Sequence, residues 1–412
     1  MNEYANRLSA PLTVDMILTD NCNHRCFYCY NPESNNRSDV RTDVKQIDKI
    51  CNEIRNIGVT HAIITGGEPF SDFDNLLYLL KTLKNNKIFP SINSNLTQIT
   101  NDSLKQITDI CENISILVSV PGLSEETYEK ITGVSGSFSK LKSGMELCRN
   151  SRANVGINIV VNDVNYDEVM NSYNLTKFIR KYNVHFLSMS PLIPKVSCDI
   201  QKTKLFDNMV DLMYDIKTSL NIDVGPVVPF PLCKITDIWK YCQLSSTPCR
   251  SSISKCSINL VTGRVYSCAH DQNDYGSIFD ESLLCIWDKM SDSLDSNHLA
   301  EACKGCKLFG MCGRGCKLMT NVHRMRVTAI NDIRNESTLP DTPCILNPAV
   351  RIRLEPLGYS LSLNGNYLYV SKKTLGCIES NFQSEFRPSQ FVGTDLYSLL
   401  KHLYYQGLLK LL

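Results

Sequence analysis

Short apolar runs rich in β-branched residues alternate, through the first half of the chain, with longer runs whose apolar positions recur at helical spacing. The short runs predict strands and the longer runs predict amphipathic helices. The predicted strands are residues 12–19, 60–66, 89–95, 114–120, 155–163 and 184–190. The predicted helices are residues 43–58, 73–86, 100–113 and 166–182, with a further helix that Ser124 caps. This alternation indicates an α/β fold of parallel strands joined by helical crossovers, with too few strands to close an eight-stranded barrel.

The end of the chain has a different pattern. Residues 351–371 predict strands, with Asn364-Gly365 as a hairpin turn. Residues 395–412 predict a terminal amphipathic helix. The whole pattern divides the chain into an N-terminal tail (1–10), an α/β domain (11–225), a small cysteine-rich domain (226–345) and an α+β C-terminal segment of strands and helices (346–412).

Composition and charge narrow the class of protein. The 412 residues include 43 Lys and Arg against 42 Asp and Glu, so bulk charge predicts no nucleic-acid or membrane partner. No apolar run reaches the length of a membrane span, and the polar start MNEYANRLSA lacks the apolar stretch of an export signal. The chain has 19 cysteines, which in this context predict a cytoplasmic protein that binds metal rather than one held by disulfides.

The most informative residues follow the first predicted strand. Cys22, Cys26 and Cys29 are separated by three and then two residues. Three thiolates at this spacing can hold three irons of a [4Fe–4S] cube and leave the fourth iron open for another ligand. Closely spaced cysteines also form structural zinc sites, which is the alternative reading.

A glycine turn follows the second predicted strand. The sequence HAIITGGEPF places Gly66, Gly67, Glu68 and Pro69 directly after residues 60–66. Glycines allow backbone to approach a ligand closely. Both the cysteine loop and this turn lie at strand ends, where parallel barrels carry their chemistry.

Together these two motifs resemble the radical SAM superfamily. The resemblance implies an open (β/α)6 partial TIM barrel over residues 11–225, a [4Fe–4S] cluster on the three cysteines, and S-adenosylmethionine (SAM) on the open iron. It also implies that Tyr28 lies near the adenine of SAM and that the turn Gly66–Pro69 contacts the amino group of its methionine end.

Further cofactor contacts are expected from polar residues at later strand ends. The resemblance points to Ser94 and Asn95, to Ser119 in the sequence SVPG, and to Asn158. The alternative for each is a polar side chain that only caps a turn.

A second cysteine array fills residues 249–344. Its pattern is Cys249, thirteen residues, Gly263, four residues and Cys268, then Cys303-x2-Cys306-x5-Cys312-x3-Cys316, and finally Cys344. This resembles the SPASM extension, which carries two auxiliary [4Fe–4S] clusters, so three clusters are expected in all. A zinc ribbon is the alternative.

The SPASM resemblance also implies which cysteines share a cluster. Cys303, Cys306, Cys312 and Cys344 would hold one cluster, and Cys249, Cys268 and Cys316 would hold the other. The fourth ligand of the latter stays open between Cys256, which we prefer, Cys242 and an empty corner. The remaining cysteines, Cys233 among them, are interpreted as buried small hydrophobic residues.

The resemblance implies the chemistry too. Reductive cleavage of SAM gives a 5′-deoxyadenosyl radical that removes a hydrogen atom from a substrate. The expected partners are a precursor peptide and an external one-electron reductant of flavodoxin or ferredoxin type. We expect a peptide maturase that forms a C–C or C–S crosslink. The alternatives are oxidation of Ser or Cys to formylglycine, as in anaerobic sulfatase maturases, and a non-catalytic iron–sulfur carrier or binding module.

Departures from the family pattern bear on this choice. Pro121 replaces a usual acidic residue, and Thr132-Gly133 replaces a usual Arg-Gly. Sulfatase maturases have an aspartate base directly after the cysteine that corresponds to Cys268, where this chain has Ala269. His270 and Asp271 remain candidate bases, each with a structural role as the alternative. The segment 346–412 vaguely resembles a leader-peptide recognition fold, with a plain cap as the preferred interpretation.

Overall fold

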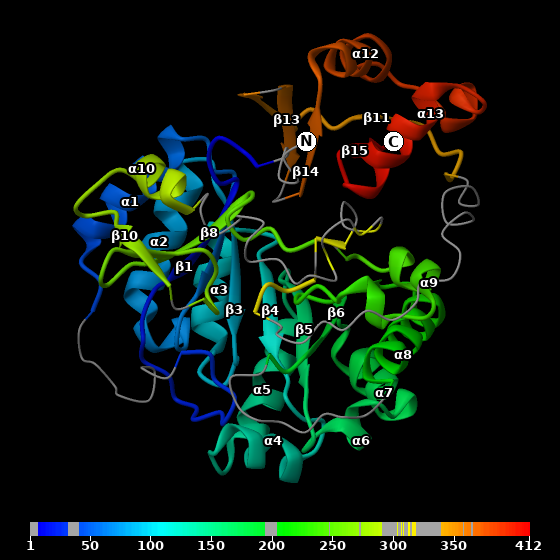
Figure 1. Ribbon diagram of the computed structural model, residues 1–412. Helices are drawn as coiled ribbons and strands as arrows, with labels where there is room; N and C mark the ends of the chain where they lie inside the picture. Colours follow the sequence, from blue (N-terminus) through cyan, green and yellow to red (C-terminus); the bar gives the residue numbers. More distant parts are fainter. Residues whose placement is uncertain are drawn as a thin grey trace.

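The computed structural model describes residues 7–31, 41–193, 204–246, 248–271, 273–290, 312–313, 315–318, 339–356, 358–363 and 366–412, together with Cys303, Cys306 and Leu308. Parallel strands form its centre in the order of the sequence (Figure 1). These strands are β1 (Thr13–Ile17), β2 (His61–Thr65), β3 (Phe89–Ser94), β4 (Ser115–Ser119), β5 (Asn154–Val161) and β6 (Phe186–Pro191). All six predicted strands are confirmed.

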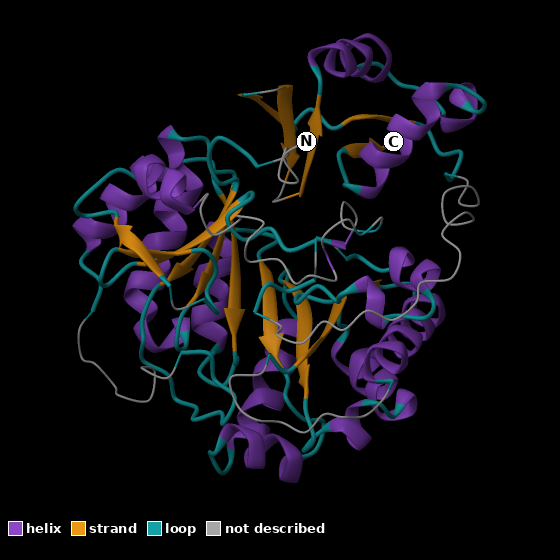
Figure 2. Ribbon diagram, viewed as in Figure 1, coloured by secondary structure: helices purple, strands orange, loops and turns teal. Residues whose placement is uncertain are grey.

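Helices follow the strands along the chain and cover the outer face of the sheet (Figure 2). A sequential strand order with right-handed crossovers places every connecting helix on the same face. The helices are α1 (Val44–Asn56), α2 (Phe73–Asn85), α3 (Asn101–Ile110), α4 (Glu125–Thr132), α5 (Ser137–Arg149), α6 (Tyr166–Val169), α7 (Ser172–Tyr182) and α8 (Leu205–Leu220).

The two faces of the sheet differ in polarity because side chains alternate along each strand. Val14, Met16, Ile64 and Ile92 belong to the buried apolar core. The alternate positions carry polar residues, namely Asp15, Ser91, Asn93, Ser119 and Asn158. The inner face of the open barrel is therefore suited to polar ligands, while the outer face packs against the helices.

The sheet continues past the six strands at both edges. The short strand β7 (Asp223–Val224) pairs with β6. At the other edge, β8 (Lys255–Asn259) lies parallel to β1, and β9 (Arg264–Tyr266) and β10 (Asp274–Ser277) follow as antiparallel strands. The cysteine-rich segment therefore shares one ten-stranded sheet with the barrel.

The helices predicted for the barrel need two corrections. The predicted helix over residues 166–182 is two helices, α6 and α7, because Asn171 turns out of the helix and its side chain caps Asn174 N. Helix α5 was not predicted at all. Its glycine, Gly144, packs so closely that an added Cβ would lie 2.6 Å from the carbonyl oxygen of Leu96, and glycine lowers helix propensity in the sequence.

The C-terminal unit has its own sheet and apolar core. Strands β12 (Arg351–Glu355), β13 (Gly358–Leu363) and β14 (Asn366–Val370) are antiparallel, and α12 (Lys372–Phe382) and α13 (Asp395–Tyr405) follow. The predicted turn Asn364-Gly365 lies outside the described residues. The predicted terminal helix is wrong beyond Tyr405. Gly407 adopts a φ of 65° that ends the helix, and β15 (Leu409–Leu411) pairs with β11 (Cys344–Leu346).

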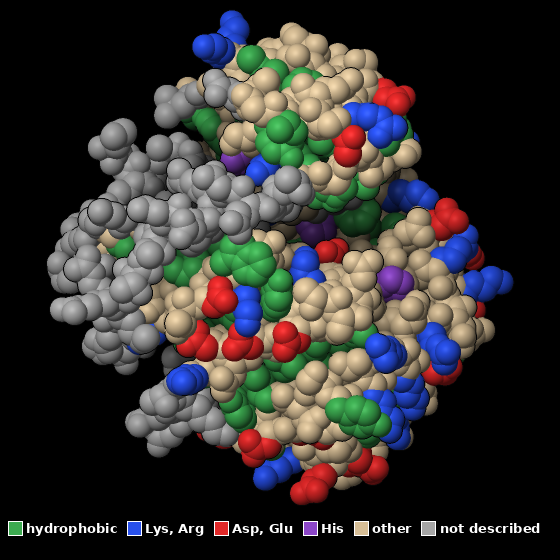
Figure 3. All heavy atoms as spheres, turned by 90° about the vertical axis from the view of Figure 1, so that its right-hand side faces the viewer, with side chains coloured by type: hydrophobic (Ala, Val, Ile, Leu, Met, Phe, Trp, Pro, Cys, Tyr) green, Lys and Arg blue, Asp and Glu red, His purple; other side chains and the backbone are tan. Residues whose placement is uncertain are grey.

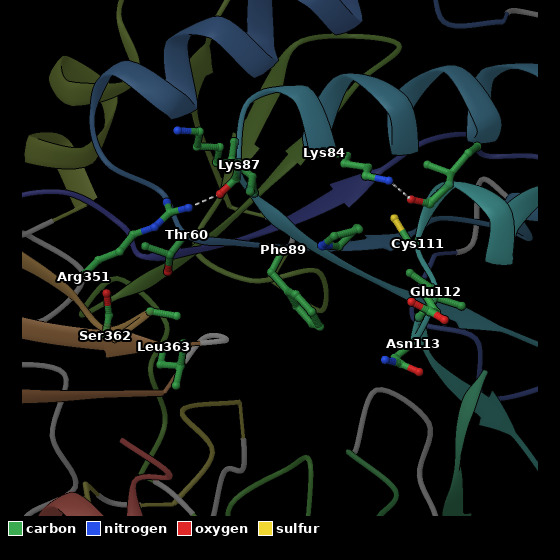
Figure 4. A pocket seen from close by; sticks show the side chains of 15 residues that line it. Thr60, Lys84, Lys87, Phe89, Cys111, Glu112, Asn113, Arg351, Ser362 and Leu363 are labelled. Carbon is green, nitrogen blue, oxygen red and sulfur yellow. Dashed lines mark hydrogen bonds between the residues drawn. The ribbon is translucent and has the colours of Figure 1, made fainter. Parts of the chain in front are cut away.

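The C-terminal unit lies against the amino ends of the barrel strands (Figure 1). A cavity of about 540 Å³ separates the two, lined by Phe89 at the start of β3, by Lys84 and Lys87, and by Arg351 and Leu363 of the C-terminal sheet (Figure 4). This cavity is at the opposite end of the strands from the cysteine loop.

The outer surface carries charges of both signs. On the face seen in Figure 3, Lys and Arg are interspersed with Asp and Glu rather than gathered into one patch. The described residues include no helix long and apolar enough to cross a lipid bilayer.

Candidate active site

The cysteine loop begins at the carboxyl end of β1. The C-terminal end of α4 supports it, because Arg25 N donates to Thr132 O at 2.8 Å and Phe27 N donates to Ile131 O at 3.4 Å. Within the loop, Cys29 N donates to Cys26 O at 3.0 Å. These bonds fold the three cysteines back on one another.

Burial raises the pKa of the Cys22 thiol to about 11 and that of the Cys26 thiol to about 12, and charge on the neighbouring Cys29 also acts to raise both. The three thiols thus lie within electrostatic reach of one another, and a bound metal would favour their ionised form. Within the described ranges, no three His, Cys, Asp or Glu side chains converge as closely as the ligands of a single metal ion. The thiolates of a cube each bind a different iron.

The glycine turn clamps the start of the cysteine loop. Gly67 N donates to Thr19 O and Glu68 N donates to Asn21 O, both at 2.7 Å. A Cβ on Gly67 would lie 2.1 Å from Asn21 O, and Gly66 has a φ of 145° that side chains rarely adopt. The glycines are required because this turn touches the backbone of the loop, a contact that the sequence did not reveal.

Glu68 links the turn to the next strand end. Its buried carboxylate accepts hydrogen bonds from Ser94 Oγ at 2.7 Å, Asn95 N at 2.7 Å and Phe70 N at 3.1 Å. Burial raises the pKa of Glu68 to about 7, although the three hydrogen bonds act to lower it. Its oxygens are occupied within the protein, so the turn presents backbone rather than this side chain to a ligand. Pro69 begins the 3₁₀ turn Pro69–Asp72.

Asn95 extends this connection to the cysteine loop. Its Nδ2 donates to Asn23 Oδ1 at 2.8 Å and lies 4.0 Å from Cys22 Sγ. Asn23 in turn donates to Thr97 Oγ1 at 2.7 Å. Asn95 thus lies beside Cys22, Ser94 is held by Glu68, and Asn23 and Thr97 are additional members of the site.

Ser119 and Asn158 are also brought together. They are register partners, Ser119 at the carboxyl end of β4 and Asn158 near the middle of β5. Ser119 is exposed, whereas Asn158 Oδ1 is buried and has no hydrogen-bond partner in the described structure. A buried polar atom without a partner is costly. This position therefore fits a polar ligand such as SAM.

Aromatic side chains flank the loop on either side. Tyr28 packs edge-on against Phe27 at 5.2 Å between ring centroids. Tyr30, which the sequence analysis missed, places its hydroxyl 3.3 Å from Thr65 Oγ1 and its ring 4.4 Å from that of His270. His270 therefore lies against the cysteine loop, although it comes from the cysteine-rich segment. The one available signal was the position of Tyr30 directly after Cys29.

Cys249, Cys268 and Lys317 lie within electrostatic reach of one another. Burial raises the pKa of Cys268 to about 11, with Cys249 raising it and Lys317 lowering it. Lys317, next to Cys316, forms a 2.7 Å ion pair with Asp271, which is buried. Burial acts to raise the pKa of Asp271, but Lys317 and Ser267 outweigh it and hold that pKa below its ordinary value. Asp271 is thus an ion-pair partner in this structure.

The remaining predicted cysteines are placed differently. Cys256 lies beside Val14 in the sheet and belongs to the apolar core, whereas its neighbour Lys255 forms a 2.9 Å ion pair with Asp15 on the inner face. Cys242 is exposed on α9 (Ile238–Gln243). Cys306 and Cys312 pack against the core of the barrel and Cys303 is buried, whereas Cys344 belongs to the core of the C-terminal unit.

The class of protein is defined by an open parallel barrel. Its carboxyl edge carries a cysteine loop, and a glycine turn clamps that loop. Residues 16–176 match the profile of the radical SAM superfamily, which marks a radical SAM domain in this part of the chain. The expected partial-barrel α/β fold is confirmed.

Known proteins resemble the chain over different lengths. GTP 3′,8-cyclase of Clostridium perfringens is 29% identical over 182 residues, which are 42% of this chain and 54% of that protein. The chain thus spans about half the length of that relative. PqqA peptide cyclase of Bradyrhizobium diazoefficiens is 21% identical over 335 residues, which are 76% of this chain and 83% of that protein.

A solved structure shares the fold over most of the chain. SuiB of Streptococcus suis, bound to S-adenosylmethionine, matches with a TM-score of 0.62 at 19% identity, covering 76% of this chain and 74% of SuiB. SuiB has also been solved bound to the precursor peptide SuiA.

Proposed function

We propose that this protein is a radical SAM peptide maturase that crosslinks a ribosomally made peptide through a C–C or C–S bond. The observation that carries the proposal is the loop of Cys22, Cys26 and Cys29, which the turn with Gly66 and Gly67 clamps at the carboxyl edge of the barrel. When bound there, a [4Fe–4S] cluster and SAM supply a 5′-deoxyadenosyl radical that can abstract a hydrogen atom from an unactivated carbon.

Residues of this chain would orient SAM at that edge. The backbone of the turn Gly66–Pro69 is the candidate for its methionine end. Asn158, with its unpartnered oxygen, and the adjacent Ser119 are candidates for its polar groups. Tyr28 is the candidate for the adenine. Glu68 would act by fixing the turn against Ser94 and Asn95.

Two auxiliary [4Fe–4S] clusters belong to the same proposal, with a SPASM-type domain around them. The closeness of Cys249, Cys268 and Lys317 supports the first. Cations lower the cost of burying a negatively charged cluster, and Lys255 and Lys317 lie beside these thiols. An external flavodoxin- or ferredoxin-type protein would supply electrons.

The peptide substrate is supported by the relatives. PqqA peptide cyclase is named for a peptide, and SuiB binds a precursor peptide in one of its structures. Crosslinking is favoured over formylglycine formation because Asp271, a candidate base, is engaged by Lys317. His270 stays the other candidate base, packed on Tyr30.

Tandem mass spectrometry of a reacted peptide tests the proposal. A crosslink removes two hydrogen atoms from the peptide and suppresses backbone fragments between the joined residues. Formylglycine formation from serine also removes two hydrogen atoms, but it leaves a full linear fragment series and an aldehyde that reacts with hydrazine. An aldehyde on a sulfatase-derived peptide would overturn the crosslinking proposal.

A further inference from the structure

Two segments far apart in the sequence pack closely in the cysteine-rich region. Cys316 N donates to Pro229 O at 3.0 Å. Gly315, with a φ of 71°, approaches Pro231 so closely that an added Cβ would lie 2.7 Å from its nitrogen. Such a contact positions the short turn Leu232–Lys234 directly beside the cysteines that precede Gly315.

Cys233 lies in that turn, next to Cys312. The backbone amide of Leu232 donates to Cys312 Sγ at 3.3 Å. Amides that donate to sulfur stabilise a thiolate, and they are a recurrent feature around iron–sulfur clusters. Cys233, the next residue along the chain, therefore lies close to Cys312.

The charges around Cys233 agree with this placement. Burial raises the pKa of its thiol above the ordinary value, and charge on Cys312 and on Cys303 acts in the same direction, while Lys234 opposes them. Charge–charge effects of this kind weaken with distance. Cys306 N donates to Cys303 O at 3.2 Å, so the first pair of the C-x2-C-x5-C motif lies together in one turn.

Cys344 is positioned elsewhere. Its backbone exchanges hydrogen bonds with Phe386, at 2.9 and 3.0 Å, and its strand β11 pairs with β15. Its side chain is 1% exposed in the apolar core of the C-terminal unit. Burial and then the charge of Asp341 raise its pKa. The described residues around it are those of a core position.

We propose that Cys233, together with Cys303, Cys306 and Cys312, holds the second auxiliary [4Fe–4S] cluster in place of Cys344. The assignment rests on the proposed function, because it assumes the auxiliary clusters, and it revises which thiol completes the second of them. Cys344 then serves the core of the C-terminal unit.

Iron analysis of cysteine variants tests the assignment. The parent is the variant in which Cys22, Cys26 and Cys29 are alanine, so that only auxiliary clusters are counted, about eight irons per chain. Adding Cys233→Ser should lower the count to about four irons, whereas adding Cys344→Ser should leave about eight. Cys285→Ser, at an exposed helical cysteine, is the matched control and should also leave about eight irons.

The reverse result, iron lost with Cys344→Ser and kept with Cys233→Ser, would overturn the assignment. Zinc at this site in place of iron would do so too. Far-UV circular dichroism checks that each variant folds. Electron paramagnetic resonance of the reduced proteins gives a second readout, since an oxygen ligand at position 233 should alter one auxiliary signal even if iron is retained. A parent that binds no iron would instead contradict the auxiliary clusters of the proposed function, and the assignment with them.

Discussion

At the scale of single residues, the site depends on Gly67 having no side chain. Gly67→Ala should displace the cysteine loop, because its Cβ would lie 2.1 Å from Asn21 O. We expect loss of the first cluster, about four of about twelve irons, and loss of SAM cleavage. Gly376→Ala is the matched control, because a Cβ there meets nothing within 4 Å. Full iron content in Gly67→Ala would contradict the proposal that close contact between Gly67 and Asn21 holds the cysteine loop in place.

Glu68 offers a second test at this scale. Gln in its place cannot accept all three hydrogen bonds, and losing hydrogen bonds to a charged group costs roughly 1.5–3 kcal/mol. About tenfold weaker SAM binding is expected. The measurement is equilibrium dialysis at a pH above 7, because the pKa of Glu68 is about 7 and the carboxylate is then mostly ionised. Glu126→Gln, at an exposed position of α4, is the control. Unchanged affinity of Glu68→Gln for SAM would contradict a role of the Glu68 hydrogen bonds in holding the turn Gly66–Pro69.

Much of the site is readable from the sequence because its motifs are local. The cysteine spacing and the turn Gly66–Pro69 each need only a few consecutive residues. Asn23 and Tyr30 could not be found in this way. Their roles come from contacts with Thr97 and His270, which lie far away in the sequence.

At the scale of elements, an ion pair on β12 ties the C-terminal sheet to the segment that leads into β1. Arg353 donates to Ala10 O at 2.8 Å and to Glu355 Oε1 at 2.7 Å, and Ser9 N donates to Glu355 Oε2 at 2.8 Å. These contacts support a structural role for the C-terminal unit. We propose that it caps the barrel rather than recognises a peptide.

Acid should therefore loosen the unit. Burial acts to raise the pKa of Glu355, but hydrogen bonds from Ser9, Arg353 and Ser360 outweigh it and hold the pKa below its ordinary value. A depressed carboxylate pKa adds stability above the unfolded pKa, and this stability is lost as pH falls through the folded value. Glu355→Gln should cost about 1–3 kcal/mol near neutral pH and abolish this acid dependence.

Hydrogen exchange of β12 and β13 between neutral pH and about pH 3 measures this effect. The exposed Glu385→Gln in the same unit is the control and should behave as the native protein. Identical acid profiles for Glu355→Gln and the native protein would contradict the proposed anchor.

The elements that the sequence predicted well are those with strong periodicity, such as β1 to β6. The break between α6 and α7 and the terminal strand β15 were missed because single residues, Asn171 and Gly407, decide them. The parallel pairing of β8 with β1 joins residues about 240 positions apart, as Asp15 and Ser257 illustrate. No local pattern encodes such a pairing.

At the scale of the whole molecule, the two ends of the barrel are distinct. The carboxyl edge carries the cysteine loop, and residues of the cysteine-rich segment reach it through the contact of His270 with Tyr30. The amino edge carries the C-terminal unit and the cavity lined by Phe89 and Arg351. This division predicts that changes in the C-terminal unit affect stability or binding more than the chemistry at the loop.

Formation of 5′-deoxyadenosine tests the central claim most directly. The reconstituted protein, reduced with dithionite under anaerobic conditions, should convert SAM to methionine and 5′-deoxyadenosine in equal amounts. The variant with alanine at Cys22, Cys26 and Cys29 should keep its auxiliary iron and form none. Absence of 5′-deoxyadenosine from iron-replete native protein, or equal formation by the variant, would contradict the assignment of this loop as the radical-generating site.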